Sequence, residues 1–97
     1  MTYTRFILSG LSIEYWYTEV RGMKKEYKHL YEKFGLNVVY YRKAIRKTQL
    51  QLAELLDIDR SHISAIELGN VGVSMDLIFK MCEVFQIKPK DLFDFRD

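Results

Sequence analysis

The feature that most constrains the fold of this chain is the central stretch TQLQLAELLDIDRSHISAIELG, which reads as two short helices joined by a tight turn. Thr48 begins the first helix as an N-cap, and Gln51 completes a capping box three residues later. Asp57 stands at the turn, because aspartate tolerates the left-handed backbone better than most residues do. Asp59 is expected to cap the second helix and Gly69 to end it. Two helices of this kind, with the second free to project outward, fit the major groove of DNA.

Helical periodicity continues on the N-terminal side of this stretch. Apolar side chains recur at helical spacing from Tyr27 to Ile45, with lysines and glutamates between them. Gly35 marks a weak point in the pattern, either a kink or a helix start. We therefore expect one long helix from about Lys24 to Arg46, or two helices that meet near the glycine.

Two more helices are expected after the central stretch. Ser74 is placed to cap one of them, and Pro89 stands near the first position of a last short helical turn. Cys82 falls on the apolar face of the first of these helices, so we expect it to pack in the core rather than to react. Because it is the single cysteine, an internal disulfide and a cysteine cluster for zinc are excluded. A reduced, cytoplasmic compartment is expected.

The segment before Met23 differs in composition from the rest of the chain. Residues 2–20 are rich in aromatic and β-branched types, residues 11–18 alternate as in a strand, and Ser9-Gly10 provides a turn for a small β-hairpin. This segment packs on the domain's own core, joins two subunits or forms a loosely ordered extension. Alternatively, Met23 is the natural start and the preceding residues are not native. We divide the chain into an N-terminal extension, residues 1–22, and a helix-turn-helix domain, residues 23–97.

Composition and missing motifs narrow the class of protein. A chain of 97 residues that is 48% hydrophobic suits one domain with a modest core, and its net charge of +2 permits a nucleic-acid partner. No stretch approaches the roughly 18 apolar residues of a membrane span. The sequence has no phosphate-binding glycine loop, no paired catalytic carboxylates and no histidine–nucleophile arrangement, so an enzyme is disfavoured. His29 and His62 fall in different predicted helices, and we expect no metal and no cofactor.

Several motifs at fixed spacing give the chain a family resemblance. The pattern TQ-x-x-LA, the pattern I-S-x-I-E and a closing glycine all fall in the central stretch, and the surrounding residues from Phe34 to Phe93 continue the same arrangement. On these residues the sequence resembles the lambda-repressor-like (Xre/Cro-type) helix-turn-helix family. The segment IDRSHISAIELG is also similar to the controller proteins of restriction–modification systems. The resemblance implies a mainly α fold, a five-helix DNA-binding bundle, to which this chain adds its N-terminal extension.

Contacts to DNA are predicted at and beside the two short helices. The N-terminus of the first helix favours a phosphate, and Gln49 adds a side-chain contact there, as its counterpart does in the family. Arg60 is expected to read a guanine, with a phosphate clamp as the alternative. For the serines and lysines of the site, ordinary solvated surface is the alternative. The other predicted contacts are Ser61, His62, Ser64 and Ala65 on the second helix, Lys43 and Lys47 at the end of the long helix, and Asn70 in the following loop.

Three residues are expected to support this surface. Thr48 caps the first short helix, and the resemblance implies a semi-buried ion pair between Arg42 and Glu67 that joins the first and third helices of the bundle. Such a pair would fix the orientation of the recognition helix, and loss of one partner would cost several kcal/mol. Arg46 and Asp57 stand where members of the family usually have glycine.

The sequence therefore predicts a sequence-specific regulator of transcription that binds double-stranded DNA. It is expected to act as a repressor, as a homodimer on a palindromic operator. The alternative is an antitoxin-like interaction module, which neutralises a partner protein through the aromatic N-terminal segment and binds its own promoter. Exposure of that segment would favour the alternative.

Overall fold

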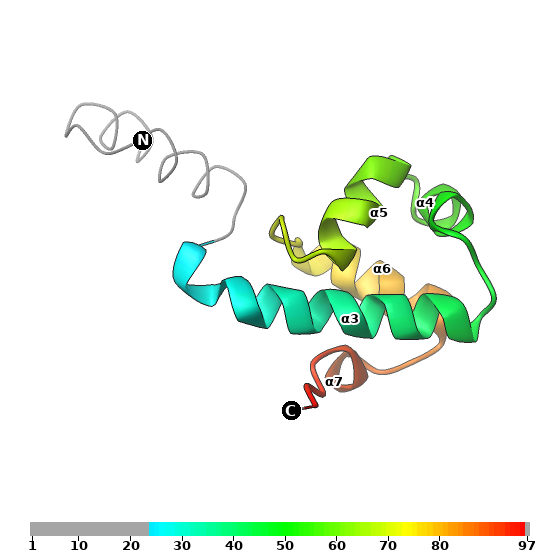
Figure 1. Cartoon of the computed structure of the whole chain (residues 1–97). Helices are drawn as coiled ribbons and strands as arrows, with labels where there is room; N and C mark the ends of the chain where they lie inside the picture. Colours follow the sequence, from blue (N-terminus) through cyan, green and yellow to red (C-terminus); the bar gives the residue numbers. More distant parts are fainter. Residues whose placement is uncertain (1–23, 97) are drawn as a thin grey trace.

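The structure, a computed structural model, describes residues 24–96 and arranges them as helices around one apolar core (Figure 1). The elements are the 3-10 turn η1 (Lys25–Tyr27) and the helices α3 (Lys28–Ala44), α4 (Gln49–Leu56), α5 (Arg60–Glu67), α6 (Met75–Phe85) and α7 (Pro89–Leu92). The mainly α, five-helix fold is confirmed, and the described residues contain no strand. The expected hairpin and the boundary after residue 22 lie outside the described residues.

The long helix α3 forms in one piece. It continues through Gly35 from Lys28 to Ala44, which confirms the expected alternative of one long helix, whereas a break of the helix at this glycine is wrong. A Cβ atom on Gly35 would lie 2.5 Å from the carbonyl oxygen of Ile66 and 2.4 Å from that of Glu67. The glycine therefore allows the backbones of α3 and α5 to approach closely, and it does not interrupt α3.

Local capping signals start three of the helices as predicted. Thr48 Oγ1 accepts from the N–H of Gln51 over 3.1 Å, and the N–H of Thr48 donates to Gln51 Oε1 over 2.9 Å, which completes the capping box of α4. Ser74 Oγ accepts from the N–H of Leu77 over 3.2 Å at the start of α6. Pro89 is the first residue of α7, where its missing N–H is not needed.

The two ends of α5 differ in how well the sequence predicts them. Asp59 occupies the N-cap position, but its side chain makes no capping hydrogen bond, so that prediction is wrong. The N–H of His62, which the carboxylate would have capped, already donates over 3.0 Å to the backbone carbonyl of Asp59. Gly69 ends the helix as predicted, with φ at 72°, and the N–H of Asn70 closes the end by donating to Ala65 O over 2.9 Å.

Three turns place a residue other than glycine in the left-handed conformation. Arg46 has φ at 59°, Asp57 at 57° and Gln86 at 58°. The first two stand where the family usually has glycine, so the turn geometry is kept although the glycine is absent. Each side chain in this conformation costs on the order of 1 kcal/mol, with aspartate among the better tolerated types.

The core lies between α3, α4, α5 and α6, and α7 adds to it the fully buried side chain of Leu92. In the view of Figure 1, α5 lies above α3 and α7 below it. Asn37 holds the C-terminal segment against α3, because its side-chain N–H groups donate to Leu92 O over 2.8 Å and to Asp94 O over 3.2 Å. Cys82 packs in the core as predicted, and burial, aided by Asp91, raises the pKa of its thiol. Among residues 24–96, no helix is both long and apolar enough to cross a membrane. The most deeply buried large side chains are those of Val38, Leu52, Ile63, Ile66, Met81 and Leu92.

Candidate nucleic-acid interface

The helices α4 and α5 form the predicted pair, and α3 supports it from below in the view of Figure 1. The turn between them is closed by Ile58, whose N–H donates to Ala53 O over 3.0 Å, after the left-handed residue Asp57. The C-terminal end of α5 lies directly on the backbone of α3 at Gly35. The second helix of the pair is therefore fixed at both ends, by the turn and by the contact at the glycine.

A hydrogen-bonded network joins the starts of α4 and α5 to the buried end of α5. Arg42 donates from Nε to Glu67 Oε2 over 2.6 Å and from Nη2 to Oε1 over 3.2 Å, which is a two-bond contact between the charged groups. Gln49 Nε2 donates to Glu67 Oε1 over 2.9 Å. Arg60 Nη1 in turn donates to Gln49 Oε1 over 3.1 Å. The exposed guanidinium of Arg60 is thus linked through one amide to a buried carboxylate.

The ion pair at the base of this network ties three parts of the fold together. Glu67 is only 7% exposed, and Arg42 lies beside it with 11% of its side chain exposed. Arg42 Nη1 also donates to Lys47 O over 2.8 Å, so α3, the turn before α4 and the end of α5 share one guanidinium. Removing either charge would leave the other buried and unpaired, which typically lowers the free energy of unfolding by about 3–5 kcal/mol.

The outward face of α5 is sparse. Arg60 and Ser61 are exposed and Ser64 is half-buried. Ala65 differs from expectation, because it packs partly against the core and offers less surface than a freely exposed residue. Leu68, directly after α5, is 61% exposed and follows Ser61 and Ser64 at helical spacing. The sequence reading missed this leucine, although its spacing from the two serines was a usable signal.

The predicted basic flank lies at the end of α3. Lys43 is exposed and Lys47 is half-buried, and both are close in sequence to the N-cap Thr48. His62 is half-buried on the flank of α5. In the part of the chain that the structure describes, no group of three His, Cys, Asp or Glu side chains is placed to hold a metal ion.

Asn70 lies at the opposite end of α5 from Arg60, and its side chain contacts α3. Lys28 Nζ donates to Asn70 Oδ1 and, over 2.6 Å, to Gly69 O. The loop after α5 is therefore held against the first turn of α3. Sequence reasoning did not single out Lys28, because no local pattern indicates a contact between residues about 40 positions apart.

A family model covers this same region of the chain. The family model described as helix-turn-helix (HTH_3) matches residues 39–92, which run from the middle of α3 to the end of α7. The match includes all four residues of the network. The chain is 40% identical over 58 residues to an uncharacterized HTH-type transcriptional regulator of Methanocaldococcus jannaschii, a match that covers 60% of this chain and 88% of that protein.

Two further relatives are controller proteins. The chain is 44% identical over 48 residues to the control protein C.BamHI of Bacillus amyloliquefaciens, which covers 50% of this chain and 59% of that protein. The crystal structure of the restriction-modification controller protein C.AhdI of Aeromonas hydrophila has a TM-score of 0.62 and 35% sequence identity, and the match covers 65% of this chain and 96% of that chain.

Proposed function

Because this chain belongs to the helix-turn-helix family, we propose that it is a transcriptional regulator that binds double-stranded DNA through α4 and α5. The observation that carries the proposal is the network from buried Glu67 through Gln49 to exposed Arg60. A side chain that is held in place before binding loses less conformational freedom when it meets its target. The network therefore supports a role for Arg60 in reading DNA.

Contacts to phosphate position the domain on the duplex. The start of α4 presents the backbone N–H groups of Gln49 and Leu50 ahead of the capped residue Gln51, and helix N-termini of this kind favour anions. Lys43 and Lys47 add positive charge beside this helix start, and His62 and Asn70 add hydrogen-bond donors on α5 and in the loop that follows it. Phosphate contacts fix register and orientation without selecting a sequence.

The side chains on the outward face of α5 make the base-specific contacts. Arg60 uses one N–H for Gln49, and the guanidinium has further donors for the two acceptors of a guanine in the major groove. Ser61 and Ser64 are small enough to allow close approach and can bond to bases. Ala65 and Leu68 supply apolar contact of the kind that suits a thymine methyl group.

A homodimer follows from the small size of this reading surface. Eight residues of α5 span about 12 Å, or three to four base pairs at roughly 3.4 Å each. Two copies related by a two-fold axis would double the sequence read and place the recognition helices about 34 Å apart on a palindromic operator. Bound over a promoter, such a dimer represses by blocking polymerase.

Selection of bound sequences from random duplex DNA tests this proposal. We expect enriched sites with two related halves centred about ten base pairs apart. Arg60→Ala should relax the base preference at one position in each half-site and reduce the binding free energy for the preferred base there by about 1–3 kcal/mol. Lys43→Ala should weaken binding to all sequences equally and lower the slope of log affinity against log salt concentration by about 1. Equal binding to all sequences would contradict a sequence-specific regulator, and a salt slope near zero would contradict phosphate contact. Transcription in vitro from a promoter that carries the selected site then tests repression.

A further inference from the structure

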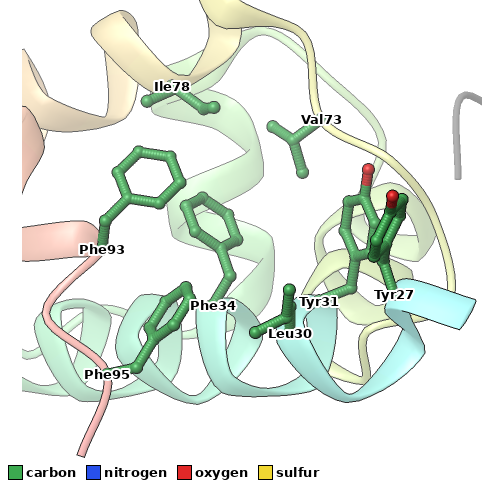
Figure 2. A pocket seen from close by; sticks show the side chains of 8 residues that line it. All are labelled: Tyr27, Leu30, Tyr31, Phe34, Val73, Ile78, Phe93 and Phe95. Carbon is green, nitrogen blue, oxygen red and sulfur yellow. The ribbon is translucent and has the colours of Figure 1, made fainter.

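An open apolar cavity of about 450 Å³ lies beside the first half of α3 (Figure 2). Its lining residues are all apolar or aromatic, and they come from η1, α3, the loop before α6, α6 itself and the segment after α7. Two tyrosine rings stand at one end of the cavity and three phenylalanine rings at the other (Figure 2). The residues that carry the argument are Tyr27, Leu30, Tyr31 and Phe34 on one side and Phe93 and Phe95 on the other.

The cavity exposes more apolar surface than a domain of this size usually leaves to water. Tyr27 and Phe93 are each 47% exposed and Leu30 is 40% exposed, and all three belong to the same cavity. Contiguous exposed patches of this kind mark surfaces that another group covers. The patch lies at the opposite half of α3 from Arg42, so a group bound there would leave the start of α5 free.

We infer that the chain's own N-terminal segment, residues 3–20, covers this cavity. Connectivity is the first argument, because the described chain begins at Lys24 and Tyr27, three residues later, already lines the cavity. The four residues 21–24 span at most about 14 Å when extended, so the end of the segment cannot lie far from the cavity. Tethering of this kind gives an effective concentration on the order of millimolar, which a free partner would have to exceed.

The composition of the segment is the second argument. Leu11, Ile13, Tyr15 and Tyr17 alternate with Ser12, Glu14, Trp16 and Thr18, so one face of a strand there would be mostly apolar. An isolated strand or hairpin is marginal in water and requires an apolar surface to pack on. The cavity offers such a surface, and its volume accommodates several apolar side chains. The inference is independent of the proposed DNA binding.

Trp16 is the single tryptophan of the chain and would lie on the other face of such a strand, so the paired changes Trp16→Phe and Tyr17→Trp move the fluorophore to the apolar face. In this full-length double variant, we expect the tryptophan emission to be shifted to the blue of that of the urea-unfolded chain and its quenching by acrylamide to be several-fold slower. Both properties should be independent of protein concentration. Leu30→Lys places a charge in the cavity at a partly exposed helical position and should shift the emission to the red and speed quenching. Phe79→Lys is the matched control, because Phe79 is 47% exposed on α6 and does not line the cavity.

Tyr27→Lys is the second test variant, and circular dichroism verifies that each variant remains helical. Solvent-like emission in the double variant without a cavity substitution would overturn the inference and would leave the segment available to a partner protein. Blue-shifted emission that disappears on dilution would overturn it in favour of a second copy of the chain as the occupant. Emission that neither cavity variant changes would also overturn it, because the tryptophan would then pack elsewhere.

Discussion

Replacing Gly35 by alanine should destabilise this domain, although the same change stabilises an ordinary helix interior by about 1 kcal/mol. The new Cβ would lie 2.4 Å from Glu67 O and 2.5 Å from Ile66 O, where ordinary contact begins at 3.4 Å. The two helices would have to separate by about 1 Å, and the atoms in the way are backbone atoms that cannot rotate aside.

The expected magnitude follows from these two opposing effects. Overpacking of a close contact costs about 1–3 kcal/mol and sometimes more, and a clash between backbones belongs at or above the upper end. After the gain in helix propensity, we expect the free energy of unfolding to fall by about 2 kcal/mol. For a domain of this size, that loss lowers the melting temperature by roughly 8–16 °C.

Urea and thermal unfolding followed by circular dichroism measure this loss. Leu36→Ala is the matched control, because Leu36 is the next residue along α3 and is 65% exposed, and it should change stability by no more than about 0.5 kcal/mol. At a temperature where all variants are folded, Gly35→Ala should also weaken DNA binding, since it displaces α5. A Gly35→Ala variant as stable as the unmodified chain would refute the close approach of α3 and α5. A destabilised variant with unchanged DNA affinity would refute the positioning role of the glycine.

Three other predictions concern buried charge, turn geometry and the thiol. Glu67→Ala should lower the melting temperature more than Arg60→Ala, because it leaves the largely buried guanidinium of Arg42 without its carboxylate partner. An equal or smaller fall in melting temperature would contradict a stabilising ion pair between Arg42 and Glu67. Gln86→Gly should raise stability by up to about 1 kcal/mol in urea unfolding, and Asp57→Gly by less, since aspartate already tolerates φ near 57°; the reverse order would be inconsistent with strain at these turns. Cys82 should react with a thiol reagent many-fold more slowly in the folded chain than in urea, because burial raises its pKa and blocks access, and equal rates would exclude its burial.

Signals that depend on neighbouring residues predicted much of the fold. The capping box at Thr48, the cap at Ser74 and the proline that starts α7 are all set within three or four residues, and the structure contains each of them. The left-handed turn at Asp57 was likewise predictable from the local preference of aspartate. Asp59 shows the limit of such signals, because a backbone carbonyl satisfied the donor that its side chain was expected to cap.

Contacts between distant parts of the chain could not be read in the same way. Gly35 looked like a weak point in a helix, because its reason for being glycine lies some 30 residues away on α5. Lys28 looked like one of many surface lysines, yet it holds the loop after α5. Gln49 was predicted as a phosphate contact, and that role stays a prediction. Its hydrogen bonds to Glu67 and Arg60 required the fold to bring three helix ends together.

The shared carboxylate of Glu67 has a consequence for engineering the specificity of this protein. The residues that orient Arg60 are spread over three separate positions in the sequence, at Arg42, Gln49 and Glu67 itself. A graft of the eight residues of α5 into another scaffold would carry over Arg60 and Glu67 without Arg42 and Gln49, which complete the network. The smallest transferable recognition unit is therefore discontinuous, and designs that exchange only one helix should lose selectivity before they lose affinity.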